Sequence, residues 1–120
     1  MTRAPEEKAK FAFIHEVGIC AVTGRSGDVH CAHVRFSDAF FGKANPGMGT
    51  KPEPVWTLPL SPEKHQQQHG MGEAEFWRLH GYDPRDPARS PLTACLVLDW
   101  HYRAGDVEAA QEWLRARIGG

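Results

Sequence analysis

The chain has 120 residues, which is enough for one domain with its own hydrophobic core. Apolar residues make up 41% and charged residues 24%, an ordinary globular composition that excludes a disordered tail, a coiled coil and a collagen-like fibre. The net charge of −1 excludes a strongly basic footprint over the whole chain but leaves a local basic groove open. Seven histidines are more than this length normally carries, and imidazole is both a metal ligand and a base near neutral pH.

The apolar runs and the cysteines indicate the cellular compartment. No apolar run approaches the roughly 20 residues of a membrane span, and residues 1–10 lack the apolar centre of a signal peptide. The three cysteines, Cys20, Cys31 and Cys95, are an odd number at wide spacing, which favours a reducing compartment over a disulfide framework. We therefore expect a cytoplasmic protein that does not contact membranes.

The first half of the chain predicts two strands. Residues 1–8 are polar and are expected to fray, and Phe11–Val22 is compatible with either a helix or a strand. After a glycine-containing turn, the alternating residues Val29–Val34 predict a strand, and Val55–Leu60 predicts a second one. The segment 36–54 between them is rich in Gly and Pro, and a loop of that length in a compact domain is often functional.

The second half predicts helices only. Ser61-Pro62 is a helix start and Gly70 a helix end, and a second helix is expected from about Glu73 to His80. Ser90-Pro91 starts a third helix that runs to about Arg103, and Asp106 caps a fourth. Two strands, a helix and a helical tail over 90–120 give an α+β fold in a single domain covering 1–120.

The strongest chemical signal is a pair of histidines on the first predicted helix. His65 and His69 are four residues apart, so both imidazoles lie on one helical face and can hold one divalent metal ion. The alternative is two polar surface histidines beside three glutamines. His33 ends the first predicted strand beside the long loop, where it can project into a cleft or serve a structural role. Alternation along the strand places His30 on the opposite face from His33, which argues against a ligand pair between these two.

An ordered series of short motifs over about residues 17–84 resembles the HNH (ββα-metal) endonucleases, and most of all a phage-borne group related to the recombination-enhancement nuclease Ref. The matching pieces are Cys20-Ala-Val-Thr-Gly-Arg25, Ala32-His33-Val34-Arg35, Gly47-Met48-Gly49-Thr50-Lys51-Pro52, Pro59-Leu60-Ser61, His65, His69, Glu75-Phe76-Trp77 and Gly81-Tyr82-Asp83-Pro84. The resemblance implies two antiparallel strands and a helix around one divalent metal ion, Zn²⁺, Mg²⁺ or Mn²⁺.

The resemblance also implies roles for individual residues. His33 would be the general base that activates water, and Asn45 the residue that orients this base. His65 and His69 would hold the metal. Arg35, Lys51 and Lys64 would contact phosphate oxygens, Arg through a bidentate fork and Lys as a point charge. The implied activity is metal-dependent hydrolysis of DNA, with DNA as partner and with recombination or phage proteins as further partners.

Two departures from the family pattern qualify that expectation. Many HNH proteins carry a structural zinc knuckle, and its four positions here read Cys20, Thr23, Ser61 and Lys64, so we expect no zinc there and a small buried residue at Cys20. In the site itself, Ala32 and Pro54 stand where relatives have a metal ligand and an aspartate, with Glu53 as a possible substitute for the latter. A non-catalytic DNA-binding module and a metal-stabilised interaction protein are therefore the alternatives to an active nuclease.

The remaining aromatic and charged residues favour packing over function. Tryptophans on short strands and amphipathic helices usually bury their rings, so we expect core positions more than base-stacking platforms for five aromatic residues. These are Trp56, Phe76, Trp77, Trp100 and Trp113. In the tail, Asp99 and His101 are expected to be surface groups.

Overall fold

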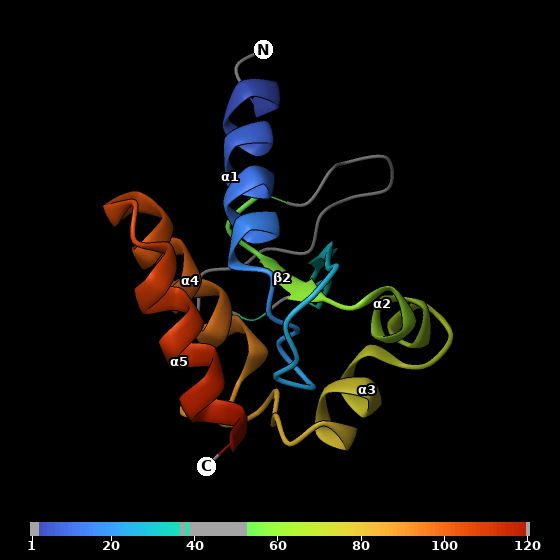
Figure 1. The fold of residues 1–120 in the computed structure, drawn as a ribbon. Helices are drawn as coiled ribbons and strands as arrows, with labels where there is room; N and C mark the ends of the chain where they lie inside the picture. Colours follow the sequence, from blue (N-terminus) through green and yellow to red (C-terminus); the bar gives the residue numbers. More distant parts are fainter. Residues whose placement is uncertain (1–2, 37, 39–52, 120) are drawn as a thin grey trace.

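A two-stranded antiparallel sheet lies at the centre of the molecule and helices surround it (Figure 1). The computed structural model describes residues 3–36, 38 and 53–119. In chain order the elements are α1 (Arg3–Val17), β1 (His30–His33), β2 (Thr57–Leu60), α2 (Pro62–His69), α3 (Glu73–Leu79), α4 (Pro91–Ala104) and α5 (Val107–Gly119). The α+β class predicted from the sequence is confirmed.

The helices form two groups on either side of the sheet. The helix α1 and the pair α4 and α5 pack together on one side, and α2 and α3 lie on the other (Figure 1). The strands pair in the register His30 with Leu60 and His33 with Thr57. Because α2 begins immediately after β2, this register sets where α2 starts relative to β1.

Three of the predicted helix caps are present. Ser61 accepts a hydrogen bond from the backbone N–H of Lys64, Ser90 from that of Leu92, and Asp106 from that of Ala109. Each bond satisfies a donor that the first turn of a helix leaves unpaired. The beginnings of α2, α4 and α5 were therefore predictable from local chemistry alone.

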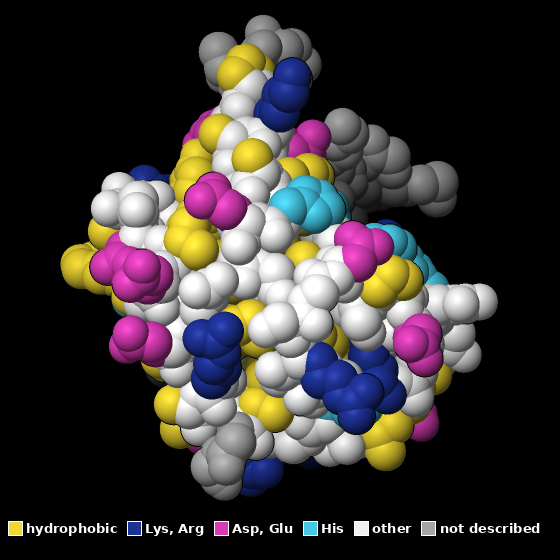
Figure 2. Space-filling view, in the orientation of Figure 1, with side chains coloured by type: hydrophobic (Ala, Val, Ile, Leu, Met, Phe, Trp, Pro, Cys, Tyr) yellow, Lys and Arg dark blue, Asp and Glu magenta, His cyan; other side chains and the backbone are white. Residues whose placement is uncertain are grey.

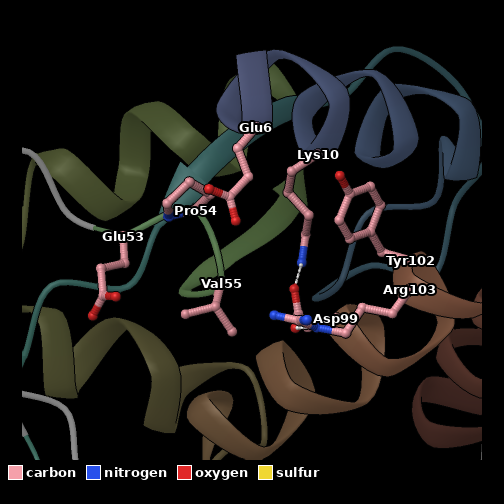
Figure 3. A pocket seen from close by; sticks show the side chains of 8 residues that line it. All are labelled: Glu6, Lys10, Glu53, Pro54, Val55, Asp99, Tyr102 and Arg103. Atoms are coloured by element: carbon pink, nitrogen blue, oxygen red, sulfur yellow. Dashed lines mark hydrogen bonds and ion pairs between the residues drawn. The ribbon is translucent and has the colours of Figure 1, made fainter. Parts of the chain in front are cut away.

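The helix α1 corrects the expectation that residues 1–8 fray. It begins at Arg3 and is fastened to α4 by Lys10, which is 1% exposed and whose Nζ lies 2.8 Å from Oδ1 of Asp99. Figure 3 shows this pair at the wall of a cavity of about 290 Å³ that Glu6, Glu53 and Tyr102 also line. Asp99, expected at the surface, is instead 9% exposed.

Most of the aromatic side chains lie in the core, as predicted. Trp56, Phe76 and Trp77 are buried, and Trp113 is half-buried against the core. Trp100 is the exception, because it is 73% exposed on the outer face of α4. None of the helices in the described part of the chain has the length and apolar character that crossing a bilayer requires.

Candidate metal centre

The histidines of α2 meet a histidine of β1. His65 and His69 lie on one face of the helix, as their spacing predicts, and their Nε2 atoms are 3.1 Å apart. On its other side, His65 faces His30, the first residue of β1, with 3.0 Å between the two Nδ1 atoms. The rings of His30 and His65 meet edge to face at 81°. Three imidazoles thus form a continuous row, His30–His65–His69.

This row suppresses protonation at its centre. Burial lowers the pKa of His65 below its ordinary value, and the neighbouring His69 and His30 rings lower it further. Charges at His33 and Arg35 act in the same direction. A lowered pKa keeps the imidazole of His65 neutral at physiological pH, which is the form that binds metal ions.

The geometry of the α2 pair is compatible with a shared metal ion. Two nitrogens bound to one tetrahedral ion at 2.0–2.1 Å lie about 3.3 Å apart, close to the 3.1 Å between the Nε2 atoms of His65 and His69. Imidazole ligands suit Zn²⁺ better than Mg²⁺, which prefers oxygen. Within residues 3–36, 38 and 53–119, however, no three His, Cys, Asp or Glu side chains are arranged to hold an ion together.

His33 lies at the other end of β1 and has a different environment. Its ring packs edge to face against Phe11 of α1, with 5.8 Å between ring centroids. Its backbone carbonyl accepts a hydrogen bond from Nε2 of Gln68, which lies on α2 between His65 and His69. The same amide donates to Glu73, which also accepts the indole N–H of Trp77 at 2.7 Å. This chain of bonds joins the end of β1 to α2 and α3.

Two of the three residues predicted to contact phosphate, Arg35 and Lys64, lie in the described part of the chain. Arg35 is exposed beyond β1, and its charge acts on His65. Lys64 donates a hydrogen bond to the side-chain oxygen of Gln67. Partial burial lowers the pKa of the half-buried His80, and the charge of Lys64 lowers it further. Asn45 and Lys51 lie outside the described residues. Ala32, which the resemblance places where HNH proteins carry a ligand, is fully buried.

The contact of His30 with His65 was not predicted from the sequence, where His30 was considered only as a ligand partner of His33. Strand alternation separates His30 from His33 correctly, but it does not show that the first residue of β1 lies beside α2. That proximity follows from the pairing of His30 with Leu60, the residue that precedes the Ser61 cap of α2. The only local signal was the His-x2-His spacing on the strand.

The four positions that the resemblance assigns to a zinc knuckle line a single hollow. Cys20, Thr23, Ser61 and Lys64 surround a space of about 560 Å³, together with the charged residues Arg25, Asp28 and Glu63. The thiol of Cys20 accepts the backbone N–H of Ser61 at 3.3 Å. Burial raises the pKa of this thiol, but hydrogen bonds from Thr23 and Ser61 outweigh burial and leave the pKa below its ordinary value. Cys20 is 1% exposed, as predicted for a small buried residue.

Comparison with known proteins finds no matching family model, no matching curated protein and no matching solved structure.

Proposed function

We propose that the chain is a small metal-dependent nuclease of the HNH type that hydrolyses DNA in the cytoplasm of a bacterial host. The observation that carries the proposal is the pair of Nε2 atoms at 3.1 Å on α2, set against a two-stranded antiparallel sheet whose first strand ends in His33. The order strand, long connection, strand, helix is the order that the resemblance implies.

A second observation supports the same family. The four positions equivalent to the zinc knuckle form two pairs, one in the turn after α1 and one at the start of α2. Cys20 and Ser61 are 41 residues apart in sequence, yet they are in hydrogen-bond contact, and all four positions line one hollow. This proximity is what the resemblance implies for these four positions, and it supports the proposal. In this proposal the knuckle ligands have been replaced, while the arrangement of the chain around them has been kept.

The residues of the chain have distinct tasks in this proposal. His65 and His69 hold the ion, which when bound polarises the scissile phosphate and stabilises the leaving oxygen. His33 accepts a proton from the attacking water, and the packing of its ring on Phe11 limits the orientations that the imidazole adopts. Arg35 binds a phosphate oxygen beside His65. Figure 2 shows Lys and Arg side chains gathered between the turn after α1 and α3, near the hollow that Arg25 and Lys64 line.

The second candidate is a DNA-binding module without catalysis. It is favoured by the buried Ala32, which supplies no ligand, and by the absence of a third ligand beside His65 and His69 within the described ranges. Catalytic zinc sites commonly have three protein ligands. A metal-stabilised interaction protein without a DNA role is the remaining alternative.

Plasmid cleavage separates these functions. Supercoiled plasmid is incubated with the protein and Mg²⁺, Mn²⁺ or Zn²⁺, and nicked and linear forms are quantified. We expect slow metal-dependent nicking that His33→Ala reduces by about 10²-fold or more through loss of the general base. His65→Ala and His69→Ala remove cleavage and metal binding together. His15→Ala, an exposed histidine on α1, is the matched control and retains both.

The contrary results are equally specific. Binding of duplex DNA that weakens with salt, without cleavage under any of the three metals, supports the DNA-binding module. Cleavage that persists in His65→Ala and His69→Ala shows that the α2 pair does not hold the catalytic ion. A protein that neither binds nor cuts DNA contradicts both DNA-directed functions.

A further inference from the structure

His65 is contacted at both nitrogens of its ring. Its Nε2 faces His69 at 3.1 Å, and its Nδ1 faces His30 at 3.0 Å. A neutral imidazole carries one N–H and one lone pair, so it donates on one side and accepts on the other. The direction of these two contacts therefore decides which nitrogen of His65 is free to bind an ion.

Metal binding by the α2 pair selects one direction. His65 binds an ion through the nitrogen that faces His69, so its Nε2 must present a lone pair and its proton must lie on Nδ1. That proton then points at Nδ1 of His30, which accepts it if the His30 proton lies on its own Nε2. Ligating histidines generally have such a partner for their second nitrogen, and the partner fixes both the tautomer and the ring orientation.

We propose that His30 is the positioning residue of this metal centre: it accepts the Nδ1–H of His65 and holds Nε2 of His65 toward the ion. The inference rests on the proposed function, because it concerns the same α2 pair. It assigns to His30 a role that neither the motif resemblance nor the strand pattern gives it.

The surrounding structure holds the two rings at this separation. The ladder pairing of His30 with Leu60 places His30 next to the start of α2, and the bond from Gln68 to the His33 carbonyl fastens the C-terminal end of α2 to the other end of β1. The helix is therefore attached to β1 at two points. His30 itself is exposed, so its side chain can be changed without opening the core.

The experiment compares two substitutions of His30 that differ in one property. Asparagine places a side-chain oxygen close to the position of the imidazole Nδ1 and keeps an acceptor, whereas leucine keeps the bulk and removes it. Zn²⁺ affinity is measured by competition with a chromogenic chelator for wild type, His30→Leu and His30→Asn. His15→Leu is the control for loss of an exposed histidine, and thermal unfolding without metal checks that all variants fold.

We expect His30→Leu to weaken Zn²⁺ binding about 10–100-fold, the usual loss for such a partner. His30→Asn should recover most of that loss, and His15→Leu should bind as wild type. In the zinc-loaded wild type, long-range ¹H–¹⁵N NMR should place the proton of His65 on Nδ1.

Each other result has a definite reading. Wild-type affinity in His30→Leu, with affinity lost in His65→Ala, overturns the role of His30 and leaves the α2 metal pair intact. Equal weakness of His30→Asn and His30→Leu also overturns it, because the imidazole of His30 is then required for more than accepting a proton. If His65→Ala and His69→Ala bind Zn²⁺ as wild type does, the proposed function fails together with the inference.

Discussion

At the scale of single residues, the feature with the largest expected energetic effect is a buried ion pair away from the candidate site. Lys10 is 1% exposed and has its charge balanced by Asp99, which also binds Nε of Arg103 at 2.8 Å. The ring of Tyr102 lies 5.2 Å from the Lys10 ammonium and adds a cation–π contact. Removing the carboxylate leaves the ammonium buried without a counter-charge.

We expect Asp99→Asn to cost about 3–5 kcal/mol of unfolding free energy, the usual effect of removing one partner of a buried pair. The double substitution Lys10→Met with Asp99→Leu should cost much less, because no charge is then left in the interior. Urea denaturation of the three proteins measures both effects. Equal losses in the single and double variants would show that packing, and not charge, dominates here.

The same pair predicts an acid dependence of stability. Burial raises the pKa of Asp99, but hydrogen bonds from Lys10 and Arg103 outweigh burial and hold the folded-state pKa below its ordinary value. A lowered pKa stabilises the fold at pH values above the unfolded pKa of about 3.9, and this contribution is lost as the pH falls through the folded pKa. Stability measured from pH 6 downward should fall less steeply in Asp99→Asn than in wild type.

At the scale of elements, the parts that could be predicted from sequence are those with local chemistry. Alternation marked the first strand, the short segment Val55–Leu60 the second, and caps the starts of α2, α4 and α5, and all of these are present close to the expected positions. The helix α1 was not predicted, because its inward positions include Lys10 and its pattern therefore does not look amphipathic. Only the partner on α4, some ninety residues away, makes a buried lysine acceptable at that position.

The candidate site shows the same division. The pairing of His65 with His69 is a property of one helix, so spacing predicts it. The contact of His30 with His65 depends on strand register and on the entry of α2 from β2, which no single segment encodes. Asn45 and Lys51 remain predictions from the resemblance alone.

The turn after α1 and the start of α2 together offer the positions for an engineered zinc site. Because Cys20, Thr23, Ser61 and Lys64 line one hollow, replacing the last three with cysteine should create a four-thiolate zinc site. We expect the triple variant to bind one additional Zn²⁺ per chain and to unfold at a higher temperature with zinc than without. Cobalt substitution should give the thiolate charge-transfer absorption that the parent protein lacks.

The control for that site is the same triple variant carrying Cys20→Ser, which should bind zinc far more weakly. If the triple variant takes up no more metal than its parent, the four positions are not arranged as a knuckle, and one support for the HNH proposal is removed.

At the scale of the whole molecule, Tyr82 connects three separate parts. Its hydroxyl donates to the carbonyl of Ala21 at 2.7 Å, its ring packs on Trp77 of α3, and the guanidinium of Arg117 on α5 lies 4.0 Å from its ring centre. Nearby, Gly24 has a φ of +73°, and a Cβ atom there would lie 3.1 Å from Ile118 of α5. The turn after α1 is thus held closely between both groups of helices.

We expect Tyr82→Phe to cost about 1–3 kcal/mol, because the carbonyl of the fully buried Ala21 loses its partner. Burial raises the pKa of Tyr82 to about 12. The stability that the protonated hydroxyl of Tyr82 contributes is therefore fully present below the unfolded pKa of about 10, and it is lost as the pH rises through 12. Urea denaturation at pH 7 and pH 11 measures both effects, and Tyr102→Phe is the control on a half-buried tyrosine. An unchanged alkaline stability profile in Tyr82→Phe would refute the assignment.

The bonds that join the end of β1 to α3 also give the molecule a natural optical reporter. The indole of Trp77 is fully buried and is linked through Glu73 and Gln68 to the backbone of His33. A shift of α2 on metal binding would therefore change the electric field around this indole and, with it, the fluorescence of Trp77. Trp100, at 73% exposure, emits from a water-like environment, and Trp100→Phe would remove that exposed contribution and leave the buried or half-buried Trp56, Trp77 and Trp113. In that variant, ion uptake at the histidine row becomes readable from intrinsic fluorescence, without a dye or a label.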